Sequence, residues 1–321
     1  MHARESVNRC HAILPTVFRL ISILDFTPFL RPLSGTRVGV LGLLLAGFAA
    51  PAAHATLATI VPARDGLVIA ADSRLTFTGA RCDGAFKILI PSRPAHTVVI
   101  ITGDSFFVTP PPAGMRDPCR YLATAPRLLD IGSVVTRALE QQAGNDPAQI
   151  SMDALTRACI RALARFQSRY PAVLRAYAGR DLFSVVIASY DPGRHTATLR
   201  NFVLRGNART GRIEPGRSNE TVLTSESRGG IWIYGETGWF NRTVYAGSGR
   251  RFLTAATLQL LNAHATIAAT TRTQALAAAE NVLTAAIRTA RSIPPPSGIG
   301  GAIRAVFLGV SPRPERMVIT H

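Results

Sequence analysis

Strand-like and helix-like segments follow one another in a fixed order along residues 56–321, and that order limits the folds open to the chain. Alternating apolar runs with turn signals between them predict strands, whereas apolar residues three or four apart predict helices. Strands are expected at 57–61, 67–71, 86–90, 97–102, 183–188, 196–204, 220–224, 231–234, 303–310 and 317–320, and helices at 128–142, 152–170, 250–263 and 272–291. The resulting order is strands, two helices, strands, two helices and strands. It predicts an α+β fold, a four-layer α-β-β-α sandwich of two antiparallel sheets flanked by helices, in which 220–224 and 231–234 complete the second sheet.

The segment before these elements has the features of a secretory signal. An apolar run over residues 38–50 follows Arg37, and small residues at Ala53 and Ala55 form an A-x-A cleavage site. The run is too short to be read as a membrane-spanning helix. Cleavage after Ala55 removes residues 1–55, makes Thr56 the new N-terminus and leaves 56–321 as a single domain. The expected location is secreted or periplasmic in a bacterium, through a Sec-type signal.

The chain is strongly basic, with a formal net charge of +17. Residues 1–55 hold five arginines and two acidic residues, a net of +3, so residues 56–321 carry the remaining +14. Such an excess suits either a polyanion-binding face or an arginine-rich surface without that function. No basic run is interleaved with aromatic residues, which make up only 7% of the chain. A nucleic-acid partner is therefore not expected, and binding that falls steeply with salt would be its signature.

Two rare residue types add detail. Lys87 is the only lysine among 36 basic residues, and a lysine, unlike an arginine, can change its protonation state within a protein. The chain has four cysteines, of which Cys10 lies in the leader. A disulfide between Cys82 and Cys119 is plausible in an oxidising compartment, with Cys159 buried and free. No spacing of cysteine and histidine typical of zinc is present, so neither a metal nor another cofactor is expected.

An N-terminal threonine forms a small catalytic unit by itself. Its hydroxyl is the nucleophile, and its own α-amino group, with an ordinary pKa of about 8, can act as the base. A nearby cation favours the deprotonated forms, and a carboxylate is needed to hold that cation in place.

The residues after Thr56 resemble the start of a mature proteasome β-subunit or of its bacterial HslV-type relative, which are threonine-type N-terminal-nucleophile (Ntn) hydrolases. The resemblance rests on a strand, a turn and an Ala-Ala-Asp-Ser-Arg run that ends at Arg74, with Asp72 standing 16 residues after Thr56. Lys87 matches the lysine of that family when one loop residue is deleted. The remaining matches are Thr102 and Gly103, the Gly-Ser-Gly run 247–249, and Ser297 with Gly298.

The resemblance implies an Ntn-hydrolase fold and a role for each of six residues. Thr56 attacks the carbonyl, Lys87 polarises the site, Asp72 anchors Lys87 and the amide of Gly103 stabilises the oxyanion. Ser248 and Ser297 hydrogen-bond near the amine of Thr56. The chain departs from the pattern at Pro294, where the family commonly has aspartate, and at Leu57, where it commonly has threonine or serine.

These observations lead to an exported hydrolase, a threonine protease or amidohydrolase, that cleaves peptide or other amide bonds through a threonyl ester. The partners implied are a peptide or small amide substrate and further copies of the chain in a homo-oligomer. No ATPase partner is expected outside the cell, and no membrane contact after cleavage. The alternative is a catalytically inactive exported module for binding or assembly on the same fold, which Pro294 mildly favours. No G-x-S-x-G or H-E-x-x-H motif suggests another hydrolase mechanism.

Overall fold

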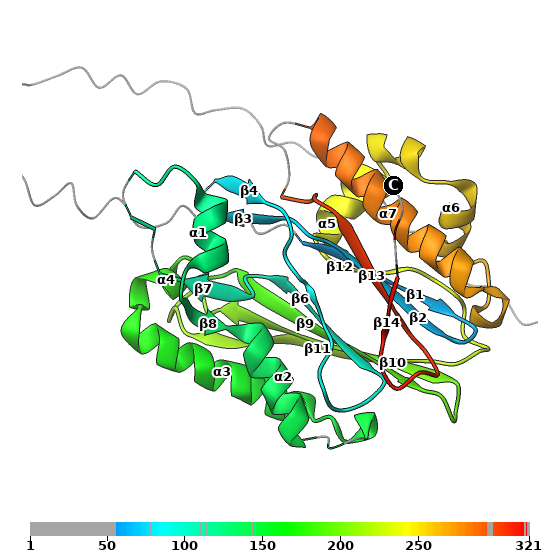
Figure 1. The fold of residues 1–321 in the computed structure, drawn as a ribbon, viewed down its shortest axis with the longest axis horizontal. Helices are drawn as coiled ribbons and strands as arrows, with labels where there is room; N and C mark the ends of the chain where they lie inside the picture. Colours follow the sequence, from blue (N-terminus) through cyan, green and yellow to red (C-terminus); the bar gives the residue numbers. More distant parts are fainter. Residues whose placement is uncertain are drawn as a thin grey trace, which may run out of the picture. The chain divides into compact units, whose positions relative to one another are not determined.

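The computed structural model describes residues 56–77, 79–109, 111–112, 114–142, 144, 146–293, 298–317 and 319. The predicted leader, 1–55, lies outside these residues. Figure 1 shows the arrangement of the helices and strands that follow.

The first sheet has five strands, all antiparallel, and contains the strand that follows Thr56. Its order is β12 (Trp232–Gly235), β1 (Leu57–Ala63), β2 (Gly66–Asp72), β13 (Ile303–Leu308) and β14 (Glu315–Met317). Every residue of β1 and β2 is buried, which explains their nearly continuous apolar sequence. The register sets Ala58 opposite Ala71, so the start of β1 lies beside the end of β2.

The second sheet also has five antiparallel strands. Its order is β11 (Ile213–Leu223), β10 (Thr196–Gly206), β9 (Asp181–Asp191), β6 (Thr97–Gly103) and β5 (Ile88–Leu89). Two further sheets have two strands each: the hairpin of β3 (Leu75–Phe77) with β4 (Ala80–Cys82), and the pair of β7 (Phe106–Val108) with β8 (Arg127–Asp130).

The helices fall into two groups along the chain. The first comprises α1 (Pro118–Thr124), α2 (Ile131–Gln142), η1 (Pro147–Gln149), α3 (Met152–Arg169) and α4 (Pro171–Arg175). The second comprises α5 (Thr237–Trp239), η2 (Phe240–Tyr245), η3 (Ser248–Phe252), α6 (Ala255–Leu261), η4 (Ile267–Ala269) and α7 (Arg272–Ser292). Here η2 is a π-helix and the other η elements are 3₁₀ helices. Side-chain caps define the starts of the long helices, Ser151 for α3 and a Thr271–Gln274 capping box for α7.

Three apolar clusters hold these elements together, and alternation along the strands divides residues between them. Leu57 and Val61 of β1 face α7, whereas Ala58 and Ile60 face the second sheet. The cluster between α7 and the first sheet is rich in alanine, which lets the helix lie close to the strands. A further cluster joins α2 and α3 to the second sheet. In Figure 1, α7 accordingly lies on β1, β2 and β13, and α2 and α3 lie on β9 and β10.

The predicted α+β class with antiparallel sheets is confirmed, and the packing of the clusters is compatible with a sandwich. Three details differ from the expectation. The run 231–234 forms β12, which pairs with β1 in the first sheet and not in the second. Residues 128–130 belong to β8, so that helix begins only at Ile131. The helix expected at 250–263 is divided into η3 and α6.

Candidate active site

Thr56 lies immediately before β1 and is 2% exposed. Its carbonyl oxygen accepts a hydrogen bond of 3.0 Å from the amide of Glu236, just after β12. Gly235 has a φ of +90°, and a Cβ there would stand 1.9 Å from that carbonyl oxygen. The close approach therefore requires glycine at 235. It fixes the backbone of Thr56 against the edge of the first sheet.

Asp72 ends β2 and lies beside the start of β1, where its carboxylate accepts four hydrogen bonds. Oδ1 accepts from the amide of Leu57 at 2.9 Å and from Nζ of Lys87 at 2.8 Å. Oδ2 accepts from the amides of Arg74 at 3.4 Å and Gly300 at 3.0 Å. The side chain is 0% exposed, so these donors replace the water that it would otherwise need. One buried carboxylate thus connects the residue after Thr56 with Lys87, and the catalytic role given to Asp72 stays a prediction.

Lys87 reaches Asp72 from the segment just before β5 and is 6% exposed. Burial lowers the pKa of its amine below the ordinary value, and the charge and hydrogen bond of Asp72 oppose that change. The pair brings together residues 15 positions apart in the sequence. A cation held so firmly beside the start of β1 is suited to stabilising negative charge there.

Gly103 ends β6, next to Thr102, with a φ of +87°. A Cβ at this position would stand 2.7 Å from the carbonyl oxygen of Leu182, so only glycine fits. Thr56, Thr102 and Gly103 line one pocket of about 390 Å³. The structure therefore places Gly103 and Thr56 on the walls of the same cavity.

Glu236 also lines this pocket and is half-buried. Burial raises the pKa of its carboxyl group above the ordinary value, and the charge of Arg242 opposes the rise. A second, larger pocket of about 630 Å³ adjoins Lys87. Ile101, Asp83, Cys82 and Cys119 are among its lining residues.

The two predicted serines are not seen in contact with these groups. Ser248 begins η3 and is exposed, and among the described residues no hydrogen bond joins it to Thr56, Asp72 or Lys87. Ser297 and Pro294 lie outside the described residues. The roles given to both serines therefore stay predictions.

The structure adds residues that sequence reasoning missed. Gly300 donates its amide to Asp72, and the Gly-Ile-Gly-Gly run 298–301 was the signal that could have indicated a close backbone approach there. Arg74 and Asp83 form an ion pair beside the site, at 2.8 Å between Nε and Oδ1. The proposed Cys82–Cys119 disulfide is present, and Cys159 is free and buried.

Within the described ranges, no three histidine, cysteine, aspartate or glutamate residues gather in the manner of a metal site. The helices in those same ranges include none that is both long and apolar enough to span a membrane.

Comparison with known proteins shows limited similarity. No family model matches the chain, and no curated protein matches its sequence. Similar solved structures include Anbu (ancestral beta-subunit) from Yersinia bercovieri, at 12% identity and a TM-score of 0.40, covering 81% of this chain and 86% of that one. The helical assembly of the Anbu complex from Pseudomonas aeruginosa gives 16% identity and a TM-score of 0.42, with 82% and 86% covered. An Anbu (Gly-1) mutant from Hyphomicrobium sp. strain MC1 gives 13% identity and a TM-score of 0.38, with 81% and 86% covered.

These findings correct one conclusion drawn from the sequence. The assignment to the proteasome β-subunit and HslV-type family was wrong, since no model of any family matches and the similar structures named above are Anbu proteins. Short matches from Thr56 to Ser297 and the order of the elements led to that assignment, and such matches do not identify a family. At these identities and TM-scores, the similarity carries no argument about the activity of this chain.

Proposed function

We propose that the chain is an exported hydrolase of peptide or other amide bonds whose nucleophile is the hydroxyl of an N-terminal Thr56. The observation that carries the proposal is the shared oxygen of Asp72, which binds both the amide of Leu57 and the amine of Lys87. The single lysine of the chain and a buried carboxylate are thereby joined to Leu57, the residue that follows the expected new N-terminus.

Removal of residues 1–55 supplies the free α-amine that the proposed reaction needs as its base. In the 321-residue chain the nitrogen of Thr56 is part of a peptide bond and cannot accept a proton. After cleavage behind Ala55 the same nitrogen is a free amine with an ordinary pKa of about 8. It can then take the proton of the threonine hydroxyl, either directly or through a water molecule.

The reaction then has two halves. The Oγ of Thr56 attacks the substrate carbonyl, and the amide of Gly103, on the wall of the same pocket, donates to the developing oxyanion. The positive charge of Lys87 favours the deprotonated nucleophile. Collapse expels the substrate amine, which takes the proton and leaves a threonyl ester on Thr56. Water, activated by the same α-amine, hydrolyses the ester and restores the hydroxyl.

We further propose that residues 56–321 form a single domain with a four-layer α-β-β-α arrangement. The protein is proposed to be secreted or periplasmic and to assemble into a homo-oligomer. We expect the reaction to need no cofactor or ATPase partner. Ser248 and Ser297 are proposed to orient the amine once it is free.

The deciding experiment examines the N-terminus and the nucleophile together. We expect the exported, purified protein to begin at Thr56 on N-terminal sequencing. Treated with an electrophilic acyl donor such as a β-lactone, it should gain the mass of one acyl group on the peptide that contains Thr56. Thr56→Ser should still be acylated, because it keeps a hydroxyl, whereas Thr56→Ala should not.

The opposite results would favour the inactive binding or assembly module. A mature protein that starts at another residue has no free amine on Thr56. Equal acylation of the Thr56→Ala and wild-type proteins, both folded by circular dichroism, would place the nucleophile elsewhere.

A further inference from the structure

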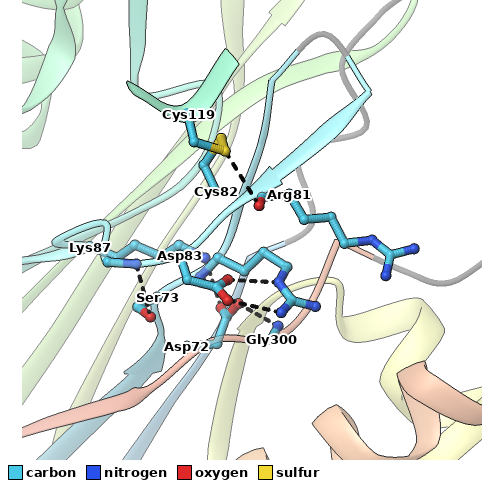
Figure 2. A network of polar contacts seen from close by, with 10 residues as sticks. Asp72, Ser73, Arg81, Cys82, Asp83, Lys87, Cys119 and Gly300 are labelled. Carbon is cyan, nitrogen blue, oxygen red and sulfur yellow. Dashed lines mark hydrogen bonds and ion pairs between the residues drawn. A yellow bond between two sulfur atoms is a disulfide. The ribbon is translucent and has the colours of Figure 1, made fainter. Parts of the chain in front are cut away.

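The segment that joins Asp72 to Lys87 is held at three points. It includes the short hairpin of β3 and β4, and it brings Lys87 back to within 2.8 Å of the carboxylate that it left at Asp72. Figure 2 shows the polar contacts of this segment around Asp72, Asp83 and Lys87. A lysine side chain loses much rotamer freedom when it is held in one place, so its backbone must be fixed as well.

The first point is the ion pair between Arg74 and Asp83. Arg74 donates from Nε and Nη2 to the two oxygens of Asp83, at 2.8 and 3.0 Å, which is the strong bidentate geometry. The hydrogen bond from Arg74 lowers the pKa of the Asp83 carboxyl group below its ordinary value. A Cβ at Gly300 would stand 2.5 Å from the guanidinium group, so the pair packs directly against the backbone that donates to Asp72.

The second point is a backbone contact next to the site. The amide of Ala85 donates to the carbonyl oxygen of Ser73 at 2.9 Å, and the amide of Gly84 donates to the hydroxyl of Ser73 at 3.4 Å. Ser73 follows Asp72 directly, and Ala85 precedes Lys87 by two residues. The two ends of the segment therefore run side by side at the carboxylate.

The third point is the disulfide between Cys82 and Cys119. Cys82 precedes Asp83 in the sequence, and the bond connects it to α1, 37 residues further along. Both cysteines line the pocket of about 630 Å³ that Lys87 also lines. The disulfide is thus a covalent restraint next to Asp83, in addition to the pairing of β4 with β3.

We propose that the Cys82–Cys119 disulfide and the Arg74–Asp83 ion pair form one positioning device that keeps Lys87 on Asp72, so that hydrolysis depends on the oxidised state of the two cysteines. The part of this proposal that concerns hydrolysis rests on the function proposed above. Neither Cys82 nor Asp83 touches the reacting atoms, and each acts through Lys87.

The redox step balances with a dithiol as the reductant. The dithiol gives two electrons, the Cys82–Cys119 bond breaks, and each sulfur takes a proton as the dithiol closes to its own disulfide. Cys159 takes no part, because it is 0% exposed and burial raises the pKa of its thiol to about 12. Within the described residues the reductant therefore has one bond to break.

The single lysine allows a direct test that does not need a substrate. Lysine labelled with ¹³C and ¹⁵N at the side-chain end gives one signal in the NMR spectrum, that of Lys87. In the oxidised protein we expect slow hydrogen exchange of the amine. After dithiothreitol, exchange should be roughly tenfold faster or more, as expected when a local structure opens. The Cys82→Ser/Cys119→Ser protein should behave like the reduced one, and the matched Cys159→Ala variant like wild type.

Hydrolysis is measured on the same samples. Reduction is expected to lower kcat about tenfold and to change KM less, since the loss falls on the group that stabilises charge in the transition state. If the NMR signal of Lys87 responds to reduction but the protein has no hydrolytic activity, the positioning device is supported and the proposed function is refuted. Mass spectrometry shows whether reduction has exposed two new thiols to alkylation. If it has, and both hydrogen exchange at Lys87 and the rate of hydrolysis stay unchanged, the positioning device is refuted.

A variant that keeps the disulfide allows the proposal to be tested without reduction, which could unfold the protein. Asp83→Asn removes the ion pair and leaves Cys82 bonded to Cys119. If circular dichroism shows that the reduced protein is unfolded, this oxidised variant decides the matter. Faster exchange at Lys87 in Asp83→Asn supports the device, and exchange equal to that of wild type refutes it.

Discussion

Nζ of Lys87 lies 2.8 Å from Oδ1 of Asp72, and both side chains are almost completely removed from solvent. A buried ion pair of this kind adds little net stability in general, because each charge has lost its hydration. Removal of one partner is costly, however, since the other charge is then buried alone. The pair is therefore better explained by what it holds in place than by its contribution to folding.

Asp72→Asn should be strongly destabilising. An asparagine offers one acceptor oxygen and one amide group, whereas Asp72 accepts hydrogen bonds through both oxygens. One set of donors would then face an NH₂ group, and Lys87 would lose its counter-charge. We expect the free energy of unfolding to fall by about 3 kcal/mol or more, measured by urea denaturation.

The matched control for that change is Asp83→Asn, whose carboxylate is half exposed. It should cost about 1 kcal/mol or less, as surface ion pairs do. Equal losses in the two variants would contradict the central place given to Asp72.

Gly103→Ala should disturb both the fold and the pocket beside Thr56. Its φ of +87° and the carbonyl of Leu182, 2.7 Å from a Cβ, leave no room for a side chain. We expect a loss of about 2–4 kcal/mol in thermal denaturation, from backbone strain and the clash together. Gly79→Ala is the control, because Gly79 has a φ of +81° and open space around its Cβ, so it tests strain alone. A similar loss at both positions would show that the close approach of Leu182 is unimportant.

Cys159 predicts a specific dependence of stability on pH. Burial raises the pKa of its thiol to about 12 from the ordinary 9.0. Between these two values the folded state keeps the proton that the unfolded state has lost, so stability decreases as pH rises. At pH 10 the thiol should account for a loss on the order of 1 kcal/mol relative to neutral pH.

Comparison of wild type with Cys159→Ala isolates this effect. Burial also raises the pKa of Tyr234, to about 12, but that group is common to both proteins. The wild type should lose more stability than the variant between pH 8 and pH 10 in urea titrations. Parallel curves would mean that the thiol is accessible to solvent.

Ser248→Ala tests whether this serine belongs to the site. The side chain is exposed and begins η3, so its removal should change stability by no more than about 0.5 kcal/mol. If Ser248 orients the free amine, loss of one hydrogen bond should slow acylation of Thr56 by roughly tenfold. Acylation at the wild-type rate would exclude Ser248 from the mechanism.

Part of the geometry beside Thr56 follows from the sequence, whereas the catalytic roles of its residues stay predictions. Asp72 ends a strongly apolar strand that must pair with the strand after Thr56, so a hairpin alone brings it to Leu57. The rarity of Lys87 indicated a special position. The glycine run 298–301 indicates a close backbone approach but does not identify its partner, because the amide of Gly300 reaches Asp72 from 228 residues further along the chain. No local pattern specifies a contact over that distance.

The fold was predictable in its elements and less so in its pairing. The apolar run 231–234 indicates a strand but does not name its neighbour, and β12 pairs with β1 at the edge of the first sheet. Leu128 fits a helical face with Ile131 and Val135 in the sequence, yet it belongs to β8, a short strand that pairs with β7. Short elements such as β3, β4 and α1 lack the length that periodicity needs, and the disulfide and the ion pair hold them instead.

The burial of Lys87 has a practical consequence for anyone who handles the protein. Reagents that couple to primary amines, such as activated esters used for dyes, beads or cross-links, will find the only lysine of the chain inaccessible. Apart from Lys87, the α-amine at the start of the chain is the other primary amine that such reagents can modify. If the chain is processed as proposed, that amine belongs to Thr56, so coupling through it would block the group that the proposed reaction requires. Attachment through an added tag at the C-terminal end avoids that loss.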